Sequence, residues 1–254
     1  MSSTPSTALR IEALTTGYQR GRRTHVVTQG LNASLPQGSF TALIGTNGSG
    51  KSTLLRTLAA LQPPIEGRIE WMGNDVNLYS PRERARCLSV VLTNRIDGAG
   101  LSVREVVEMG RMPYTGFHGR LNEADHNIVC QAMEDTAVGH LARRSIHSLS
   151  DGERQRVMVA KALAQQTPII LLDEPSAFLD YPGKLALLQL LQQLSEKQGK
   201  TILLSTHDLE QALRMVSHLW LLNGNQLHEG SPQEFAENGM LEKIFAVPPH
   251  HLRT

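Results

Sequence analysis

Apolar residues gather along the chain in short runs that alternate with stretches of helical spacing. The runs PIILLDE at 168–174 and TILLSTHD at 201–208 are too short for helices, and their lack of polar alternation is typical of parallel strands buried on both faces. Gly199 suits the position after a helix end, and Asp208 suits the start of the next helix. One apolar helical face is predicted between the two runs, formed by Leu187, Leu188, Leu191 and Leu194.

The remaining pattern predicts two additions to this parallel core. The first forty-odd residues alternate or cluster β-formers in LRIEALTTGY, THVVTQGLNASL and SFTALIG, which favours an N-terminal antiparallel β subdomain. Residues 81–150 are richer in helical pattern and predict an inserted helical subdomain, while LWLLNGNQLHEG predicts a hairpin. We therefore expect one α/β domain over 1–254, with a parallel-sheet core and these two subdomains.

Composition and charge narrow the class of protein. The chain has 254 residues with a net charge of +1, from 25 basic and 24 acidic residues, so no basic stripe suggests a nucleic-acid partner. Cys87 and Cys130 have no metal-ligand spacing and suggest free thiols in a reducing cytosol. No apolar run approaches the roughly 18 residues of a membrane span, so we expect no membrane-spanning segment.

A phosphate-binding loop follows the run SFTALIG. Residues 45–52, GTNGSGKS, match G-x-x-x-x-G-K-[ST] between a predicted strand and a predicted helix, which indicates the P-loop NTPase fold. Lys51 is expected to reach the β- and γ-phosphates, and the Ser52 hydroxyl to bind Mg²⁺. The predicted nucleotide contacts here are Gly45, Asn47, Gly48, Ser49, Gly50, Lys51, Ser52 and Thr53.

Polar side chains end the two buried runs. Asp173 ends IILL, where a parallel strand directs its last side chains toward the ligand crevice, so we expect it to hold Mg²⁺ through water. Glu174 is predicted to point elsewhere and to take a proton from an attacking water. His207 follows the neighbouring strand, and a polar contact to the γ-phosphate is its predicted role.

A second glycine segment, LSDGERQRV, begins at Leu149. Ser150 and Glu153 form an S-x-x-E capping box, so a helix should begin here with Gly152 in its first turn. The phosphate loop already supplies one anion site within a subunit. A second site is useful if it contacts the γ-phosphate of ATP held by another copy of the protein.

In this order, the motifs resemble those of the ATP-binding cassette ATPases. The signature LSDGE lies at 149–153, PSAFLD at 175–180 resembles the D-loop, and His207 resembles the switch histidine. The resemblance implies a homodimer that sandwiches two ATP molecules, with Ser150, Gly152 and Glu153 facing the partner's nucleotide. It also implies that Tyr18 stacks on adenine and that Asp180 lies across the dimer interface.

One position departs from the family pattern. The family carries a glutamine after an apolar strand, where it contacts Mg²⁺ and the attacking water, whereas this strand reads LSVVLTNR with Thr93 in that place. Three alternatives are open: Thr93 takes the glutamine's role through a water molecule, Asn94 substitutes for the glutamine, or the coupling is weaker. We count Thr93 as a candidate for catalysis and for the metal site.

The segment 100–117 suggests the partner. It follows the Thr93 position, where the family docks integral-membrane permease subunits, and Arg111, Met112, Tyr114 and Phe117 are residue types enriched in interfaces. The sequence GRMPYTG is similar to that of importers of iron–siderophores, haem and cobalamin. That resemblance implies an importer ATPase on the cytoplasmic face of the membrane, served indirectly by a periplasmic or surface substrate-binding protein.

Two alternatives stay open at this point. A soluble scaffold of the same family, such as an iron–sulfur assembly component, would not copurify with an integral membrane protein. A non-catalytic module gated by nucleotide would tolerate the loss of Glu174.

Overall fold

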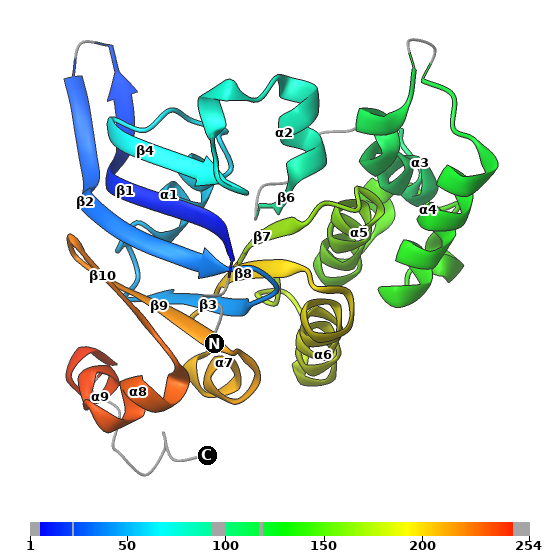
Figure 1. Ribbon diagram of the computed structural model, residues 1–254. Coiled ribbons are helices and arrows are strands. Elements are labelled where there is room, and N and C mark those ends of the chain that lie inside the picture. Colours follow the sequence, from blue (N-terminus) through cyan, green and yellow to red (C-terminus); the bar gives the residue numbers. More distant parts are fainter. Residues whose placement is uncertain (1–5, 22, 93–99, 117–118, 246–254) are drawn as a thin grey trace.

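A six-stranded, mainly parallel sheet forms the centre of the molecule (Figure 1). The computed structural model describes residues 6–21, 23–92, 100–116 and 119–245. All neighbouring strands of this sheet are parallel except the last two along the chain, which form the predicted hairpin. In spatial order the strands are β10 (Gln226–Gly230), β9 (His218–Asn223), β3 (Phe40–Gly45), β8 (Thr201–Ser205), β7 (Ile169–Asp173) and β6 (Leu88–Val91).

The register of the central strands determines what lies at the edge of the sheet. Every residue of β3, β7 and β8 is buried, as the apolar runs predicted. Asp173 pairs with Ser205, and Ser205 is level with Leu43, so these three strands end side by side. Their carboxyl ends therefore deliver polar side chains to one place.

A second sheet is antiparallel and covers one side of the core. Its order is β2 (Arg23–Pro36), β1 (Thr7–Arg20), β4 (Glu66–Trp71) and β5 (Asn74–Asp75). The first two predicted strands are found in this sheet, as expected, whereas the third run, SFTALIG, supplies β3 of the central sheet. Two adjacent residues of β3 show the three-layer arrangement. Leu43 joins the core shared with β1 and α1, while Ile44 joins the core on the opposite face.

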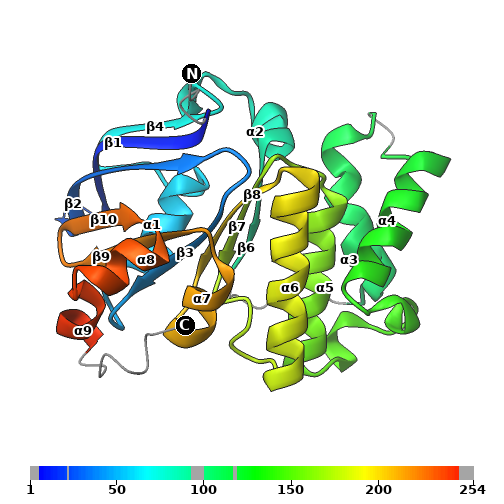
Figure 2. The ribbon, with the colours of Figure 1, turned by 60° about the horizontal axis from the view of Figure 1, so that its bottom comes forward.

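Helices cover both faces of the central sheet (Figure 2). The predicted leucine face is buried: Leu191 is fully buried and the other three leucines nearly so, and the helix ends at Gly199 with φ 64°. Asp208 accepts a hydrogen bond from the Gln211 N–H at the start of the next helix, as predicted. The helices are α1 (Lys51–Leu58), α6 (Tyr181–Gln198), α7 (Leu209–Met215), α8 (Pro232–Glu237) and α9 (Met240–Phe245).

The helical part of the chain has an apolar core of its own. Valines of α3 and α4 pack against α5 there, whereas β6, which lies between α2 and α3 in the sequence, pairs with β7 in the central sheet. The limits 81 and 150 stay a prediction. The α-helices of this region are α2 (Pro81–Cys87), α3 (Val103–Glu108), α4 (Glu123–Asp135) and α5 (Asp151–Ala164); the 3₁₀ turns are Met109–Tyr114, Gly139–Leu141 and Ile146–Ser148, with another at Val76–Leu78.

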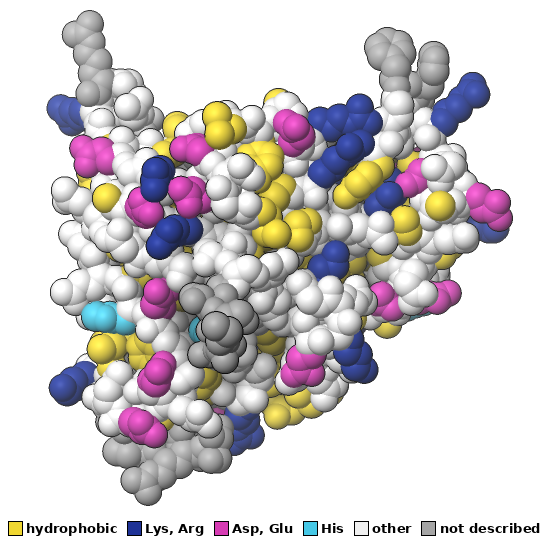
Figure 3. All heavy atoms as spheres, in the orientation of Figure 1, with side chains coloured by type: hydrophobic (Ala, Val, Ile, Leu, Met, Phe, Trp, Pro, Cys, Tyr) yellow, Lys and Arg dark blue, Asp and Glu magenta, His cyan; other side chains and the backbone are white. Residues whose placement is uncertain are grey.

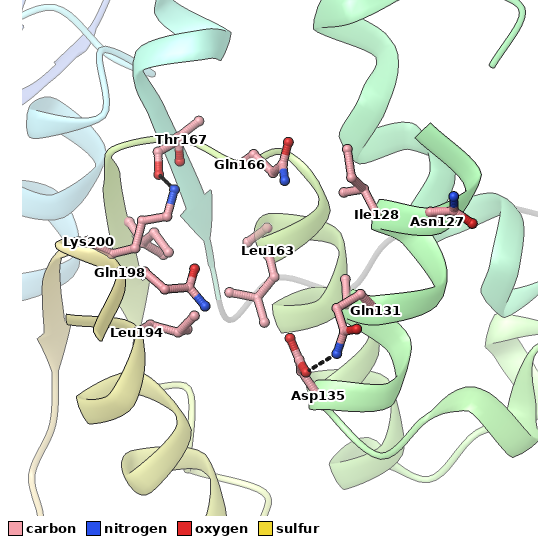
Figure 4. A pocket seen from close by; sticks show the side chains of 13 residues that line it. Asn127, Ile128, Gln131, Asp135, Leu163, Gln166, Thr167, Leu194, Gln198 and Lys200 are labelled. Atoms are coloured by element: carbon pink, nitrogen blue, oxygen red, sulfur yellow. Dashed lines mark hydrogen bonds between the residues drawn. The ribbon is translucent and has the colours of Figure 1, made fainter. Parts of the chain in front are cut away.

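A cavity of about 430 Å³ separates α4 from α6 and is floored by α5 (Figure 4). Its walls carry amide side chains and the amine of Lys200, which donates a 2.9 Å hydrogen bond to the Thr167 carbonyl. Burial lowers the pKa of Lys200. The cavity therefore keeps α4 partly apart from α6, and the close contacts of α4 lie elsewhere.

A buried ion pair joins three elements within the helical part. Arg111 Nε donates to Asp125 Oδ1 at 2.9 Å, and Arg111 Nη1 donates to the Ala164 carbonyl at 2.8 Å. Burial by itself raises the pKa of Asp125, but hydrogen bonds from the Asn122 N–H and Arg111 outweigh it and hold this pKa below its ordinary value. The pair ties the 109–114 turn to both α4 and α5.

The surface bears mixed charge. On the face shown in Figure 3, acidic and basic side chains are interspersed and no single sign dominates. Among the described helices, none has the length and apolar character needed to cross a bilayer.

Removing one partner of the buried pair should destabilise the protein strongly. Asp125→Ala leaves the Arg111 guanidinium buried without its anion, which costs about 3–5 kcal/mol, or roughly 10 °C in melting temperature for a chain of this size. Thermal unfolding followed by circular dichroism measures this. The control, Glu210→Ala, breaks the exposed Glu210–Arg214 pair at 2.9 Å and should cost less than about 1 kcal/mol.

The same pair predicts a pH dependence. The folded-state pKa of Asp125 lies below its unfolded value near 4, so the pair's contribution is complete above about pH 4 and is lost as pH falls through the folded pKa. The stability gap between wild type and Asp125→Ala should therefore shrink in acid. A gap that grows in acid would contradict this assignment.

Candidate functional site

The phosphate loop joins the end of β3 to the start of α1 and is shaped by glycines. Gly48 and Gly50 have φ of 77° and 100°, a region that side chains rarely adopt. A Cβ on Gly50 would also lie 2.6 Å from Val27 Cγ1, and one on Gly45 would lie 2.5 Å from the Leu222 carbonyl oxygen. The loop therefore requires glycine for close packing as well as for its backbone path.

Lys51 reaches back across this loop. Its Nζ donates to the carbonyls of Gly45 at 2.9 Å and Thr46 at 3.1 Å, and only 7% of the residue is exposed. Burial lowers the pKa of Lys51, while the carboxylates of Glu174 and Asp173 act in the opposite direction. The cation is thus held at the loop with two carboxylates nearby.

The loop also contains an unsatisfied polar atom. Ser49 Oγ is buried and, within the described residues, has no hydrogen-bond partner. A buried hydroxyl without a partner costs about 1–3 kcal/mol. An anionic oxygen bound in the loop would satisfy it, which is a direct sign that the loop fits a phosphate.

Asp173 and Ser52 meet as predicted from their places in the sequence. Ser52 Oγ donates to Asp173 Oδ1 at 3.1 Å, and Asp173 is almost fully buried. Ser205 Oγ, at the end of β8, donates to the same carboxylate oxygen at 2.7 Å. A carboxylate and a hydroxyl therefore lie together beside the phosphate loop.

Glu174 follows Asp173 at the end of β7 and is held differently. Its φ of 46° lies in the left-handed region, which is uncommon for a residue with a side chain. Its backbone N–H donates to Ser205 Oγ at 2.9 Å, and its Oε2 lies 3.6 Å from His207 Nδ1. Both side chains are partly exposed, and the Glu174 side chain lines the cavity of the phosphate loop.

That cavity measures about 460 Å³ and extends from the loop to an aromatic pair. The rings of Tyr18 and His25 lie with centroids 4.9 Å apart, and Tyr18 is 44% exposed. The lining residues are Tyr18, His25, Val26, Val27, Glu174 and the loop residues Asn47, Gly48, Ser49, Gly50, Lys51, Ser52 and Thr53. The predicted adenine contact thus shares one cavity with the predicted phosphate-loop contacts other than Gly45, which is not among the described residues that line it.

The second glycine segment is not part of this cavity. Ser150 and Glu153 form the predicted capping box at the start of α5, and neither they nor Gly152 are among the described residues that line it. A Cβ on Gly152 would lie 3.0 Å from the Phe178 carbonyl oxygen, so the segment packs on the 175–180 loop. Asp180 in that loop caps α6 by accepting from the Gly183 N–H.

The remaining predicted site and interface residues differ in where they lie. Thr93 and the competing Asn94 lie outside the described residues, as does Phe117. Arg111 was expected to be an interface residue, but its ion pair with Asp125 buries it, so it is not available for docking. Met112 is 63% exposed and remains a candidate contact.

Sequence reasoning missed Ser205 and His25. Ser205 was detectable in principle, because it ends TILLS at the position where Asp173 ends the neighbouring strand. His25 gave no signal, since its place beside Tyr18 depends on the pairing of β1 with β2.

Comparison with known proteins gives consistent relatives. Residues 28–177 match the family described as ABC transporter. The chain is 39% identical to the ferric enterobactin transport ATP-binding protein FepC of Escherichia coli, over 94% of this chain and 87% of that protein. It is 38% identical to the iron(3+)-hydroxamate import ATP-binding protein FhuC of Bacillus subtilis, over 94% and 88%.

Solved structures give the same picture. A structure described as an inward-facing metal-chelate type ABC transporter matches with a TM-score of 0.79 and 32% identity, over 95% of this chain and 90% of that chain. A dimeric ATP-binding cassette bound to ADP and Pi matches with a TM-score of 0.78 and 27% identity, over 88% and 98%.

The position of Tyr18 generates a binding prediction. Tyr18→Ala removes the ring that faces the cavity, and loss of base stacking of about 1–3 kcal/mol should weaken ATP binding about 5- to 150-fold. Tyr18→Phe keeps the ring and should bind as wild type does. Equilibrium titration with a fluorescent ATP analogue measures both, and equal weakening by Ala and Phe would exclude stacking as the cause.

Proposed function

The chain belongs to the ABC transporter family, and from this premise we propose that it is the ATP-hydrolysing subunit of an importer for ferric siderophores. The observation that carries the proposal is the meeting of the phosphate loop, Asp173 and Glu174 at one cavity, in a chain 39% identical to a siderophore transport ATP-binding protein.

ATP occupies the cavity with its phosphates in the loop. The backbone N–H groups and Lys51 hold the phosphates, Ser49 Oγ gains the partner that it lacks, and Tyr18 stacks on the adenine. Because most of these contacts come from the loop backbone, binding depends on the glycines as much as on charged side chains.

The residues beside the loop fit Mg²⁺. Magnesium binds proteins through oxygen ligands, usually one or two carboxylates together with substrate phosphates. The Ser52 hydroxyl and the Asp173 carboxylate, 3.1 Å apart, supply such oxygens, and Thr93 stays a third candidate outside the described residues. When bound, the ion would neutralise charge on the β- and γ-phosphates.

Hydrolysis needs a base and a positioned water. Glu174 accepts a proton from the water whose oxygen attacks the γ-phosphorus, and the bond from that phosphorus to the β–γ bridging oxygen breaks to give ADP and phosphate. His207, 3.6 Å from Glu174, is within reach of the same region and contacts the γ-phosphate. Lys51 offsets the negative charge.

The working unit is a homodimer. The signature residues Ser150, Gly152 and Glu153 lie apart from the cavity of their own subunit, and a dimeric relative has been solved with ADP and Pi. Each signature then faces the nucleotide of the partner, as the resemblance implies. Asp180 lies at the contact between the two subunits.

The permease subunits in the membrane are the partners that ATP hydrolysis drives. The exposed part of segment 100–116, which includes Met112, docks onto a permease, so the chain is peripheral on the cytoplasmic face. Among siderophores, haem and cobalamin, the relatives' names favour siderophores, and they favour an importer over an iron–sulfur scaffold. A substrate-binding protein delivers the cargo to the permease.

Glu174→Gln should slow ATP turnover strongly while ATP still binds. The amide keeps the shape and lacks the basicity, so steady-state hydrolysis should fall about 10²- to 10⁴-fold. The trapped nucleotide should then stabilise a dimer, visible by gel filtration with ATP and Mg²⁺. Glu196→Gln, an exposed change on α6, is the control and should hydrolyse ATP normally. Unchanged turnover in Glu174→Gln would overturn the assignment.

Uptake tests the transport function itself. Cells lacking this chain should lose uptake of radioactive iron bound to a siderophore, and wild type but not Glu174→Gln should restore it. Normal uptake together with loss of iron–sulfur enzyme activity would instead favour the scaffold.

A mixed dimer tests the shared site. Lys51→Ala and Ser150→Arg subunits should each be inactive as homodimers, but in a mixed dimer both changes fall in one composite site and leave the other intact. Partial recovery of hydrolysis is expected. Because Ser150 also caps α5, loss of the cap costs about 1 kcal/mol, and a thermal melt must show that the variant is folded. No recovery in verified heterodimers would exclude independent sites shared between subunits.

A further inference from the structure

Ser205 bonds to both acidic residues of the site, to the carboxylate of Asp173 and to the backbone N–H of Glu174. It is fully buried at the end of β8, and its one hydroxyl proton goes to Asp173 Oδ1 at 2.7 Å. Its oxygen accepts the backbone N–H of Glu174 at 2.9 Å. The hydroxyl therefore donates to Asp173 and accepts from Glu174. Both hydrogen bonds can have only this direction, because a serine hydroxyl has one proton and the Glu174 N–H can only donate.

The two bonds act on atoms that have little freedom. Asp173 Oδ1 also accepts from Ser52 Oγ at 3.1 Å, so the carboxylate is held from α1 and from β8 at once. Glu174 has φ 46°, a conformation that costs about 1–3 kcal/mol and persists only when its surroundings hold it. The hydrogen bond from its N–H to Ser205 Oγ is one of the contacts that stabilise this conformation.

We propose that Ser205 is a positioning residue for hydrolysis, which sets the place of the Glu174 base relative to the Asp173 carboxylate. The inference rests on the proposed function and adds a residue to it. Without the hydroxyl, the Glu174 N–H loses its partner and the left-handed turn relaxes, so the Glu174 side chain shifts away from the attacking water. Asp173 loses one of the two hydroxyl donors that the described residues supply, and is freer to rotate away from Ser52.

The effect should fall on the chemical step. The loop backbone, Lys51 and Tyr18 determine ATP binding, and none of them has a described hydrogen bond to Ser205. Loss of a hydrogen bond to a charged group together with misplacement of the base should lower kcat about 10- to 100-fold. The KM for ATP should change less than about threefold.

A matched pair of variants isolates the hydroxyl. Ser205→Thr and Ser205→Val have the same shape and differ only in the hydroxyl group. Thr should keep most of the wild-type kcat, whereas Val should show the full loss. Ser205→Ala is the small counterpart and should resemble Val. If Ala does not fold, the comparison of Thr with Val still decides the question.

Another buried serine controls for simple loss of a hydrogen bond. Ser89 is 1% exposed in β6 of the same sheet, and its Oγ accepts from Thr167 Oγ1 at 2.9 Å. Ser89→Ala should lower the melting temperature as Ser205→Ala does, with kcat unchanged. An equal fall of kcat in both variants would reduce Ser205 to a structural role and overturn the proposal.

Metal dependence gives a readout that does not require turnover. In the Glu174→Gln background, the Mg²⁺ concentration needed for half-maximal ATP-induced dimerisation is measured with Ser, Thr and Val at position 205. Val should raise it about 3- to 10-fold, because Asp173 is held less well, and Thr should not. Equal Mg²⁺ requirements for Thr and Val, together with equal kcat values in the Glu174 background, would overturn the proposal.

These outcomes distinguish failure of the Ser205 proposal from failure of the proposed ATPase function. If Glu174→Gln lowers turnover but Thr and Val at position 205 are equivalent, only the positioning role fails. If Glu174→Gln leaves turnover unchanged, the hydrolytic assignment fails and the positioning role fails with it.

Discussion

The buried carboxylate of Asp173 is the constraint around which the site is arranged. A carboxylate removed from water needs hydrogen-bond donors, and two of them come from Ser52 on α1 and Ser205 on β8. Those donors can be present only if β7 and β8 end level with each other and α1 begins beside them, which the register of the parallel sheet ensures. Ser205, placed in this way, also accepts the backbone N–H of Glu174.

The helix α5 connects the two functional regions of the molecule. Its first turn carries Ser150 and packs against the 175–180 loop through Gly152. At its other end, the Ala164 carbonyl accepts from Arg111, and the Gln165 carbonyl just beyond it accepts from Tyr114 Oη at 2.9 Å. In the proposed function, about 21 Å of stiff helix thus joins the segment that docks on the permease to the signature that faces the partner's nucleotide.

Close backbone approach explains why this connection is firm. A Cβ on Gly110 would lie 2.4 Å from the Lys161 carbonyl oxygen, so the 109–114 turn lies directly on α5. The cavity between α4 and α6 shows the contrast, because partly open space separates these two helices there. The 109–114 turn is therefore fixed to α5 by direct backbone and side-chain contact.

The sequence by itself determined the local features of this protein. Buried strands, the leucine face of α6, the capping box of Ser150 and Glu153, the glycine loop and the pairing of Ser52 with Asp173 were all predicted, because each depends on short-range periodicity or on the rule that parallel strands end at one edge. The family resemblance then supplied roles for several of these residues.

Only the tertiary structure decided which side chains are buried and what they meet. Arg111 has the composition of an interface residue, yet Asp125 and the end of α5 enclose it. Ser205 looks like an ordinary strand end, and its bonds to the Asp173 carboxylate and to the Glu174 backbone N–H depend on the register between β7 and β8. Such contacts join residues that are distant in the chain, and the local pattern of either partner contains no information about the other.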